Sequence, residues 1–230
     1  MNYRFAHRSA LILSALFCLE TILLITDHPL ISTIDHTVIG SVQAHITPFK
    51  TSLAKSFTFL ANVPSLSIIM LFFSFLIYRI SRRPYEALWF LFHQAIGAGA
   101  VNGLIKLFIA RKRPTILRLD DIGGYSFPSG HTMGAAICYV TFALWLYHYY
   151  LKSQSSSTRK IQASSSIYYR IFIAISFLLV FAIAWSRIYL GVHYPTDVLA
   201  GGFLGFAWVI IAFRSREWPF LTNKLKKRSL

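Results

Sequence analysis

Six stretches of about 20 mainly apolar residues recur along this chain, and each is long enough to cross a lipid bilayer as a helix. Lipid offers no partner for free backbone polar groups, so such stretches form helices rather than open sheets. With 55% hydrophobic residues and a mean hydropathy of +0.54, the chain is too apolar for an ordinary soluble domain. We therefore predict an all-α, polytopic membrane protein with six transmembrane helices, forming a single domain over residues 1–230.

The predicted spans cover residues 10–26, 56–78, 86–109, 130–150, 167–185 and 195–213. Pro64 lies inside the second span and is expected either to kink it or to mark its true start. Between residues 27 and 48, apolar side chains recur every four positions, which predicts a short amphipathic helix on the membrane surface: Ile34, Val38, Val42 and Ile46. The Ser-rich, basic segment 152–166 has no hydrophobic pattern and is expected to form a flexible loop.

The formal net charge of +15 raises the question of a nucleic-acid partner. The basic residues, however, flank the apolar stretches, which favours membrane lipids as partners and no nucleic acid. With six spans, the 23 Lys and Arg residues divide into fifteen on the side of the termini and eight on the other. This asymmetry predicts cytoplasmic termini in a multi-pass plasma-membrane protein. The dispersed acids and the two cysteines show no metal-ligand spacing, so no metal site is expected.

Two polar clusters precede the predicted fourth span. The first joins Lys106 to Arg113 and Pro114; two helical turns would place both cations on one face, about 10 Å apart, if the helix persisted that far. The residue before a proline disfavours the helical basin, so the helix is expected to end here. The second cluster is Pro-Ser-Gly-His at residues 128–131, where the exposed amides of a helix start, at Ser129 and Gly130, can cradle an anion.

A third cluster separates the last two spans and contains Arg187, His193 and Asp197. Pro195 suits the first turn of a helix, so Asp197 should lie about one turn beyond His193 and reach its ring. An imidazole held by a carboxylate near a fixed cation is a reasonable nucleophile or base for an anionic substrate. The alternative is an ordinary helix end with interfacial Arg, His and Tyr side chains.

In an alternating bundle, all three clusters emerge on the same, extracytoplasmic face. They can therefore form one pocket that contains three cations, two histidines, one carboxylate, a serine hydroxyl and free helix-start amides. Such a pocket would bind a phosphoryl group and stabilise the charge on its oxygens during transfer.

The segments Lys-x6-Arg-Pro, Pro-Ser-Gly-His and Ser-Arg-x5-His-x3-Asp resemble the signature of the type 2 phosphatidic acid phosphatase (PAP2) superfamily. This family also includes vanadium-dependent haloperoxidases, and the match covers eleven specified positions in the right order. The resemblance implies a PAP2/haloperoxidase-like helical bundle and a phosphatase that needs neither a metal nor another cofactor. Among the members of the family, the chain is similar to the bacterial membrane lipid phosphatases.

The resemblance also implies a role for each motif residue. His193 would attack phosphorus to form a phosphohistidine, and Asp197 would orient its ring. His131 would protonate the leaving oxygen and then activate the water that hydrolyses the intermediate. The phosphate oxygens would be held by Lys106, Arg113 and Arg187, with Ser129 and the Gly130 amide completing the cradle.

A site at the outer leaflet favours a lipid phosphate over a soluble ester. Since bacterial relatives commonly act on phosphatidylglycerol phosphate, undecaprenyl diphosphate or phosphatidate, the expected substrate is undecaprenyl diphosphate first and phosphatidylglycerol phosphate next. Two alternatives stay open: a lipid phosphotransferase that passes the phosphoryl group to a sugar or lipid hydroxyl, and a non-catalytic membrane protein such as a channel or lipid-binding scaffold.

Overall fold

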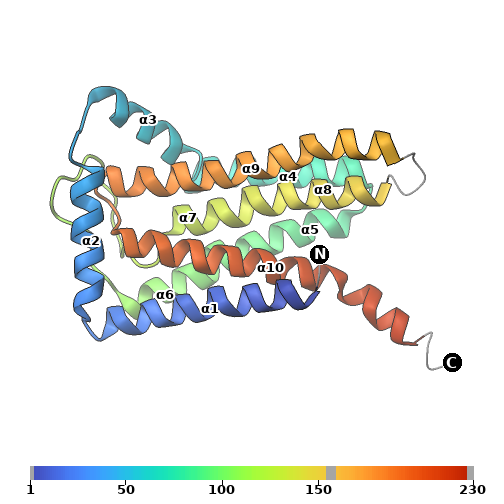
Figure 1. The fold of residues 1–230 in the computed structure, drawn as a ribbon, viewed down its shortest axis with the longest axis horizontal. Coiled ribbons are helices and arrows are strands. Elements are labelled where there is room, and N and C mark those ends of the chain that lie inside the picture. The colour runs from blue at the N-terminus through green and yellow to red at the C-terminus, as the bar shows by residue number, and fades with distance from the viewer. Residues whose placement is uncertain (1–2, 154–158, 227–230) are drawn as a thin grey trace.

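The computed structural model describes residues 3–153 and 159–226, which form a helical bundle (Figure 1). Its elements in chain order are α1 (Tyr3–Ile25), α2 (Pro29–Val42), α3 (Pro48–Phe59), α4 (Val63–Ser81), α5 (Pro84–Gln94), η1 (Ala95–Val101), α6 (Asn102–Ile109), α7 (Gly130–Ala135), η2 (Ala136–Val140), α8 (Thr141–Ser153), α9 (Arg159–Tyr189) and α10 (Pro195–Lys226). The elements η1 and η2 are π-helical segments that continue the α-helices on either side. The prediction of an all-α membrane protein is confirmed.

Five helical stretches of the described residues are long and apolar enough to cross a membrane: Arg4–Ile25, Val63–Ser81, Pro84–Ile109, Ile167–Tyr189 and Pro195–Arg214. The predicted span over residues 130–150 is a continuous helical column made of α7, η2 and α8, and it is not one of these five. Residues 132–143 of this column are buried without interruption, and α7 packs against both α9 and α10. A helix buried on all sides belongs to the centre of a bundle.

The second predicted span begins later than expected. Residues 56–59 belong to α3, and α4 starts at Val63 with Pro64 in its first turn. Proline is tolerated there because the first amides of a helix have no partner within it. Pro64 was predicted either to kink this span or to mark its start. The structure shows that it marks the start.

The predicted loop over residues 152–166 is only partly correct. Helix α8 continues to Ser153, residues 154–158 lie outside the described residues, and α9 begins at Arg159. A helix that is already formed over an apolar span adds further residues at little cost, even through serines. The N-terminal part of α9 is therefore helical where the composition predicted a loop.

The amphipathic helix predicted between residues 27 and 48 is present as α2, which lies across one end of the bundle (Figure 1). Its side chains Val38 and Val42 pack against Ile188 of α9 and Val198 of α10. Ile46, predicted to share this apolar face, follows the helix and is exposed. Helix α3 lies at the same end of the molecule and packs against α9.

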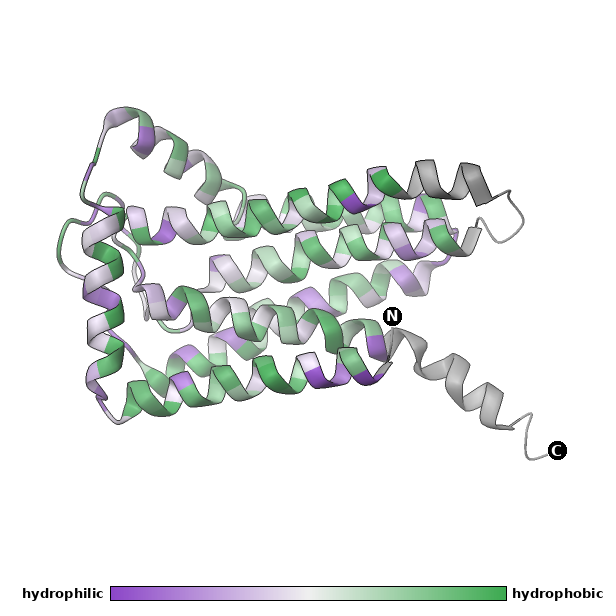
Figure 2. Ribbon diagram, viewed as in Figure 1, coloured by the Kyte–Doolittle hydropathy of each residue, from purple (hydrophilic) through white to green (hydrophobic). Residues whose placement is uncertain are grey.

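Apolar residues dominate the bundle helices along their length (Figure 2). Aromatic side chains pack in the interior, among them Phe73 and Phe142, whose stacked rings have centroids 3.9 Å apart. The outer faces carry large exposed apolar side chains, among them Ile68, Phe108 and Leu178. Helices with apolar outer faces suit a lipid environment, where close packing rather than burial from water holds them together.

Candidate active site

The loop between α9 and α10 carries the central histidine of the third motif. Gly191 turns this loop with φ +69°, a conformation that glycine adopts freely. A Cβ at this position would also collide with the carbonyl oxygen of Leu117. The amides of Val192 and His193 then donate to the carbonyl oxygen of Arg187, at 3.2 and 3.3 Å. The backbone therefore fixes His193 directly beside the end of α9.

His193 and Asp197 form a buried pair, and their side chains are 2% and 0% exposed. The imidazole Nδ1 of His193 lies 3.3 Å from Oδ2 of Asp197, as the helical spacing predicted. The same Oδ2 accepts the amide of Tyr194 at 2.8 Å. A proton on Nδ1, shared with the carboxylate, leaves Nε2 unprotonated, with a lone pair that can attack a substrate.

A pocket of about 360 Å³ brings residues from all three motifs together. Its polar lining includes Lys106, Arg113, Gly130, His131 and His193. The wall made by these residues is cationic and carries two imidazoles. A pocket of this composition attracts a phosphate dianion.

The same pocket continues along an apolar wall. This wall is lined by Val63, Leu66 and Met70 of α4 and by Ala95 and Ala98 of η1. The pocket is therefore polar at one end and apolar between two bundle helices, which matches a molecule with a charged head and a hydrocarbon chain.

The first motif reaches the pocket through a loop rather than along a helix. Helix α6 ends at Ile109, and Ala110 adopts a left-handed conformation with φ 50°. The two-turn spacing on one helical face therefore does not apply to Lys106 and Arg113. Arg113 is held by the loop itself, because its Nη2 donates to the carbonyl oxygen of Tyr125 at 3.1 Å.

Both cations of the first motif contact neighbours in the pocket. Arg113 Nη1 lies 3.2 Å from Nε2 of His193 and donates to the carbonyl oxygen of Val192 at 2.7 Å. Lys106 Nζ donates to the carbonyl oxygens of Tyr125 and Ser126, at 2.8 and 3.1 Å. Arg113 thus contacts the third motif directly, and Lys106 shares the pocket with His193.

Arg187 was predicted to be the third cation of the pocket, but it is fully buried and does not line it. Its Nη1 donates to Thr58 Oγ1 of α3, while Nε and Nη2 have no hydrogen-bond partner among the described residues. A buried guanidinium with two unpartnered nitrogens is costly unless a ligand supplies acceptors. The sequence did not single out Thr58, because a lone threonine on a polar helix carries no motif.

The second motif starts the central helical column. The prediction of an exposed amide at Ser129 is wrong, because this amide donates to the backbone oxygen of Asp197 at 2.8 Å. Gly201 of α10 makes this contact possible, because a Cβ there would lie 2.5 Å from the Ser129 carbonyl oxygen. The Ser129 hydroxyl accepts from Thr132, and Gly130 rather than Ser129 lines the pocket. His131 is oriented by Asn62, whose Oδ1 lies 2.9 Å from Nε2 of the ring.

The structure adds a cluster that the motifs did not predict. Arg111 donates from Nη1 to Asp197 Oδ1 at 2.7 Å and from Nη2 to Asp35 Oδ2 at 2.5 Å. Asp35, on α2, also accepts the amide of Thr196 at 3.0 Å. The carboxylate of Asp197 is therefore shared between Arg111 on one side and His193 on the other.

Burial and charge act in opposite directions in this cluster. Burial works to lower the pKa of Arg111, but Asp197 and Asp35 outweigh it and raise that pKa above its usual value. For His193, burial dominates and lowers the pKa to about 3, although Asp197 acts in the opposite sense. His193 is therefore neutral at physiological pH, which is the form that can attack phosphorus.

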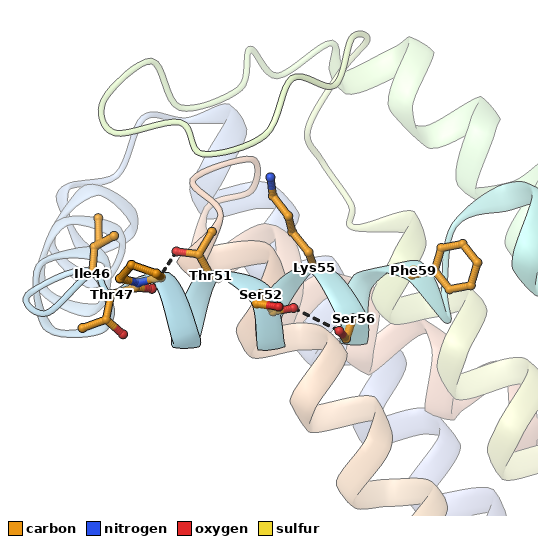
Figure 3. Close-up of a pocket in the computed structure, with 8 residues that line it drawn as sticks. Ile46, Thr47, Thr51, Ser52, Lys55, Ser56 and Phe59 are labelled. Atoms are coloured by element: carbon orange, nitrogen blue, oxygen red, sulfur yellow. Dashed lines mark hydrogen bonds between the residues drawn. The ribbon is translucent and has the colours of Figure 1, made fainter.

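A separate hollow of about 840 Å³ runs along α3 (Figure 3). Its lining carries hydroxyl groups, including Thr51, Ser52 and Ser56, together with the cation Lys55. No residue of the three motifs lines this hollow. The convergent motif residues therefore mark the pocket beside His193 as the candidate active site.

Comparison with known proteins identifies the family. Residues 86–220, which include all three motifs, match the PAP2 superfamily. The chain belongs to the PAP2 superfamily. Over 105 residues this PAP2 chain is 35% identical to phosphatidylglycerophosphatase B of Bacillus subtilis (strain 168), an alignment that covers 46% of each protein. The chain thus spans about half the length of the curated relative it matches.

Two crystal structures share the fold of this PAP2 protein. A transmembrane PAP2-type phosphatidylglycerolphosphate phosphatase from Bacillus subtilis is similar with a TM-score of 0.76 and 24% identity, over 89% of this chain and 96% of the other. Aquifex aeolicus LpxE is similar with a TM-score of 0.57 and 24% identity, over 78% of this chain and 94% of the other.

Proposed function

We propose that this protein is an integral-membrane lipid phosphatase that removes phosphate from a lipid head group through a phosphohistidine intermediate. The observation that carries the proposal is the shared pocket lined by Lys106, Arg113, Gly130, His131 and His193. These residues come from three separate stretches of the chain and provide a nucleophile, a second imidazole and cations for phosphate oxygens.

The reaction begins when the phosphate oxygens bind to Lys106 and Arg113 at the pocket wall, and we propose that they reach past this wall to the unpartnered N–H groups of Arg187. Nε2 of His193 attacks phosphorus, and the bond between phosphorus and the lipid oxygen breaks. A proton from His131 passes to the leaving oxygen, and Asp197 balances the charge of the phosphorylated imidazolium. His131 then takes a proton from water, which attacks phosphorus and breaks the phosphorus–nitrogen bond, releasing inorganic phosphate and neutral His193.

The proposed substrate is phosphatidylglycerol phosphate, ahead of undecaprenyl diphosphate. This order reverses the sequence prediction, because the 35% identical relative is named a phosphatidylglycerophosphatase. The apolar wall formed by Leu66, Met70 and Ala98 supports a lipid rather than a soluble ester.

We propose further that the helical column of α7, η2 and α8 is a sixth span and that residues 1–230 form one membrane domain. The active site would then lie on the extracytoplasmic face, at the end of the bundle where α2 and α3 lie, with both termini cytoplasmic. The distribution of Lys and Arg along the sequence supports this orientation.

The test is phosphate release in detergent from phosphatidylglycerol phosphate, undecaprenyl diphosphate and phosphatidate, with the wild type and His193→Ala. The proposal expects fastest release from phosphatidylglycerol phosphate and none above background in the variant. A sugar or glycerol acceptor added in parallel separates hydrolysis from transfer. Equal activity of the two proteins would contradict the proposed nucleophile.

A further inference from the structure

The carboxylate beside His193 is not an isolated charge. Asp35, Arg111 and Asp197 form one hydrogen-bonded trio, in which Arg111 bridges the two acids at 2.5 and 2.7 Å. Both carboxylates are enclosed, with side-chain exposures of 3% for Asp35 and 0% for Asp197. Charges in such surroundings interact strongly, so the net charge of the trio matters more than that of any one member.

With both acids ionised, the trio carries a net charge of −1. Without Asp35, the remaining Arg111–Asp197 pair would be neutral. Attack on phosphorus makes the ring of His193 cationic, and a cation in a buried site needs a nearby counter-charge. Asp35 therefore gives the trio the net charge of −1 that balances this imidazolium.

Other charged groups near the trio do not replace Asp35. Glu20 of α1 is buried close by, but neither of its carboxyl oxygens makes a hydrogen bond to any described residue. Arg113 approaches His193 from the pocket side, where the substrate phosphate supplies its counter-charge. Asp35 is thus the second acid that contacts Arg111, and it does not line the pocket that contains His193.

Asp35 also fixes the start of α10. Its Oδ1 accepts the amide of Thr196 at 3.0 Å and the Thr196 hydroxyl at 2.9 Å. Thr196 directly precedes Asp197, so one side chain on α2 sets both the position and the charge balance of the carboxylate that holds His193.

We propose that Asp35 is a positioning residue for the phosphoryl-transfer reaction: through Arg111 and Thr196 it keeps Asp197 oriented and anionic toward His193. The inference rests on the proposed phosphatase function. It assigns a catalytic consequence to the amphipathic helix α2, which has no residue in the three motifs.

The experiment compares Asp35→Asn, Arg111→Gln and the double variant, using phosphate release from phosphatidylglycerol phosphate in detergent. Asp35→Asn keeps the side-chain shape and removes the charge, so kcat should fall about 10- to 100-fold with KM nearly unchanged. Arg111→Gln leaves the two acids with a charge of −2, and in the double variant Asp197 alone restores the charge of −1. Asp35→Asn should therefore lower kcat when it is made in the wild type. The same substitution should raise kcat when it is made in the Arg111→Gln variant.

Two control variants remove an acid elsewhere. Asp27→Asn removes an exposed acid from the turn before α2, and Glu86→Gln removes a buried acid from the start of α5, at the far end of the bundle. Both should keep the wild-type kcat. Size-exclusion elution and thermal unfolding identify any variant that fails to fold, and the Arg111→Gln background still tests the inference if Asp35→Asn alone does not fold.

Three outcomes would overturn the inference. Wild-type kcat in Asp35→Asn would show that the charge is not needed. A double variant no faster than Arg111→Gln would show that Asp35 acts only through folding. A wild type without phosphate release would overturn the proposed function together with the inference, whereas the first two outcomes leave that function intact.

Discussion

Oδ1 of Asp197 lies 2.7 Å from Nη1 of Arg111, while Oδ2 of the same carboxylate lies 3.3 Å from Nδ1 of His193. One buried acid therefore connects the structural ion cluster to the proposed nucleophile. The carboxylate is held rigidly from one side and is available to the imidazole from the other. Such an arrangement fixes both the tautomer and the orientation of a reacting histidine.

Replacement of Asp197 by Asn tests this connection. The amide keeps the approximate shape but cannot balance an imidazolium, and it can present an N–H to His193. We expect kcat to fall by about two to four orders of magnitude, as when an orienting carboxylate is lost from other histidine-dependent sites. Steady-state phosphate release checks this, and a decrease of less than about tenfold would argue against the role.

Arg187 provides a test of phosphate recognition. Its Nε and Nη2 are buried and have no partner among the described residues, so we infer that they receive phosphate oxygens. Arg187→Lys keeps the positive charge but cannot present two parallel N–H groups. We expect a lower kcat/KM and weaker competitive inhibition by inorganic phosphate or vanadate. Unchanged inhibition constants would place the phosphate elsewhere.

Gly201 and Gly202 form a matched pair on α10. A Cβ at Gly201 would lie 2.5 Å from the Ser129 carbonyl oxygen, whereas a Cβ at Gly202 would meet nothing within 4 Å. Gly201→Ala should lower stability by roughly 1–3 kcal/mol through overpacking and displace the second motif, reducing activity. Gly202→Ala should leave both unchanged or raise stability slightly. Thermal unfolding in detergent distinguishes them, and equal effects would contradict the packing described.

The buried His193 predicts a pH dependence of stability. Burial lowers its pKa to about 3 in the folded protein, while an unfolded histidine has a pKa of about 6.5. The unfolded state therefore binds a proton first as the pH falls. The contribution of neutral His193 to the free energy of unfolding is fully present above about pH 6.5. It decreases by about 1.4 kcal/mol per pH unit as the pH falls toward 3.

The control for this pH dependence is His193→Gln, which has no titrating ring. Between pH 7 and pH 4, the unfolding temperature of the wild type should decrease more steeply than that of the variant. Parallel curves would mean that the folded protein protonates His193 as readily as the unfolded chain does.

The meeting of the three motifs was predictable from the sequence. Lys106, His131 and His193 stand at span ends that an alternating bundle places on one face, and the structure lines one pocket with all three. Covalent spacing also predicted the His193–Asp197 contact, because Pro195 starts a helix between them. These features depend on local periodicity and on the number of crossings, both of which a sequence carries.

Asp35 and Arg111 were missed for a physical reason. Arg111 stands among other basic residues, and its partners lie 76 and 86 positions away along the chain. A signal was present, however: Asp35 follows Ile31 by four residues and precedes Ile39 by four, so it interrupts the apolar stripe of α2. An acid on the buried face of an amphipathic helix requires a partner, although the sequence does not say which one.

The boundaries of the predicted membrane spans were also partly wrong. The apolar pattern runs through Phe57 and Phe59 into the true span, so hydropathy merged the end of α3 with α4. Asn62 and Pro64 were the local signals for the break, since an N-cap residue followed by proline favours a new helix. The substrate order depended on comparison with relatives, because no local pattern encodes a lipid head group.

Trapping of the covalent intermediate tests most directly whether His193 is the nucleophile. The wild type is mixed with phosphatidylglycerol phosphate that carries a radiolabelled terminal phosphate, quenched with alkali within one turnover, and digested for peptide mapping. If His193 is the nucleophile, acid-labile, alkali-stable label appears on the peptide that contains His193, and none appears in His193→Ala. Label on another residue, or full turnover by the His193→Ala protein, would contradict this assignment.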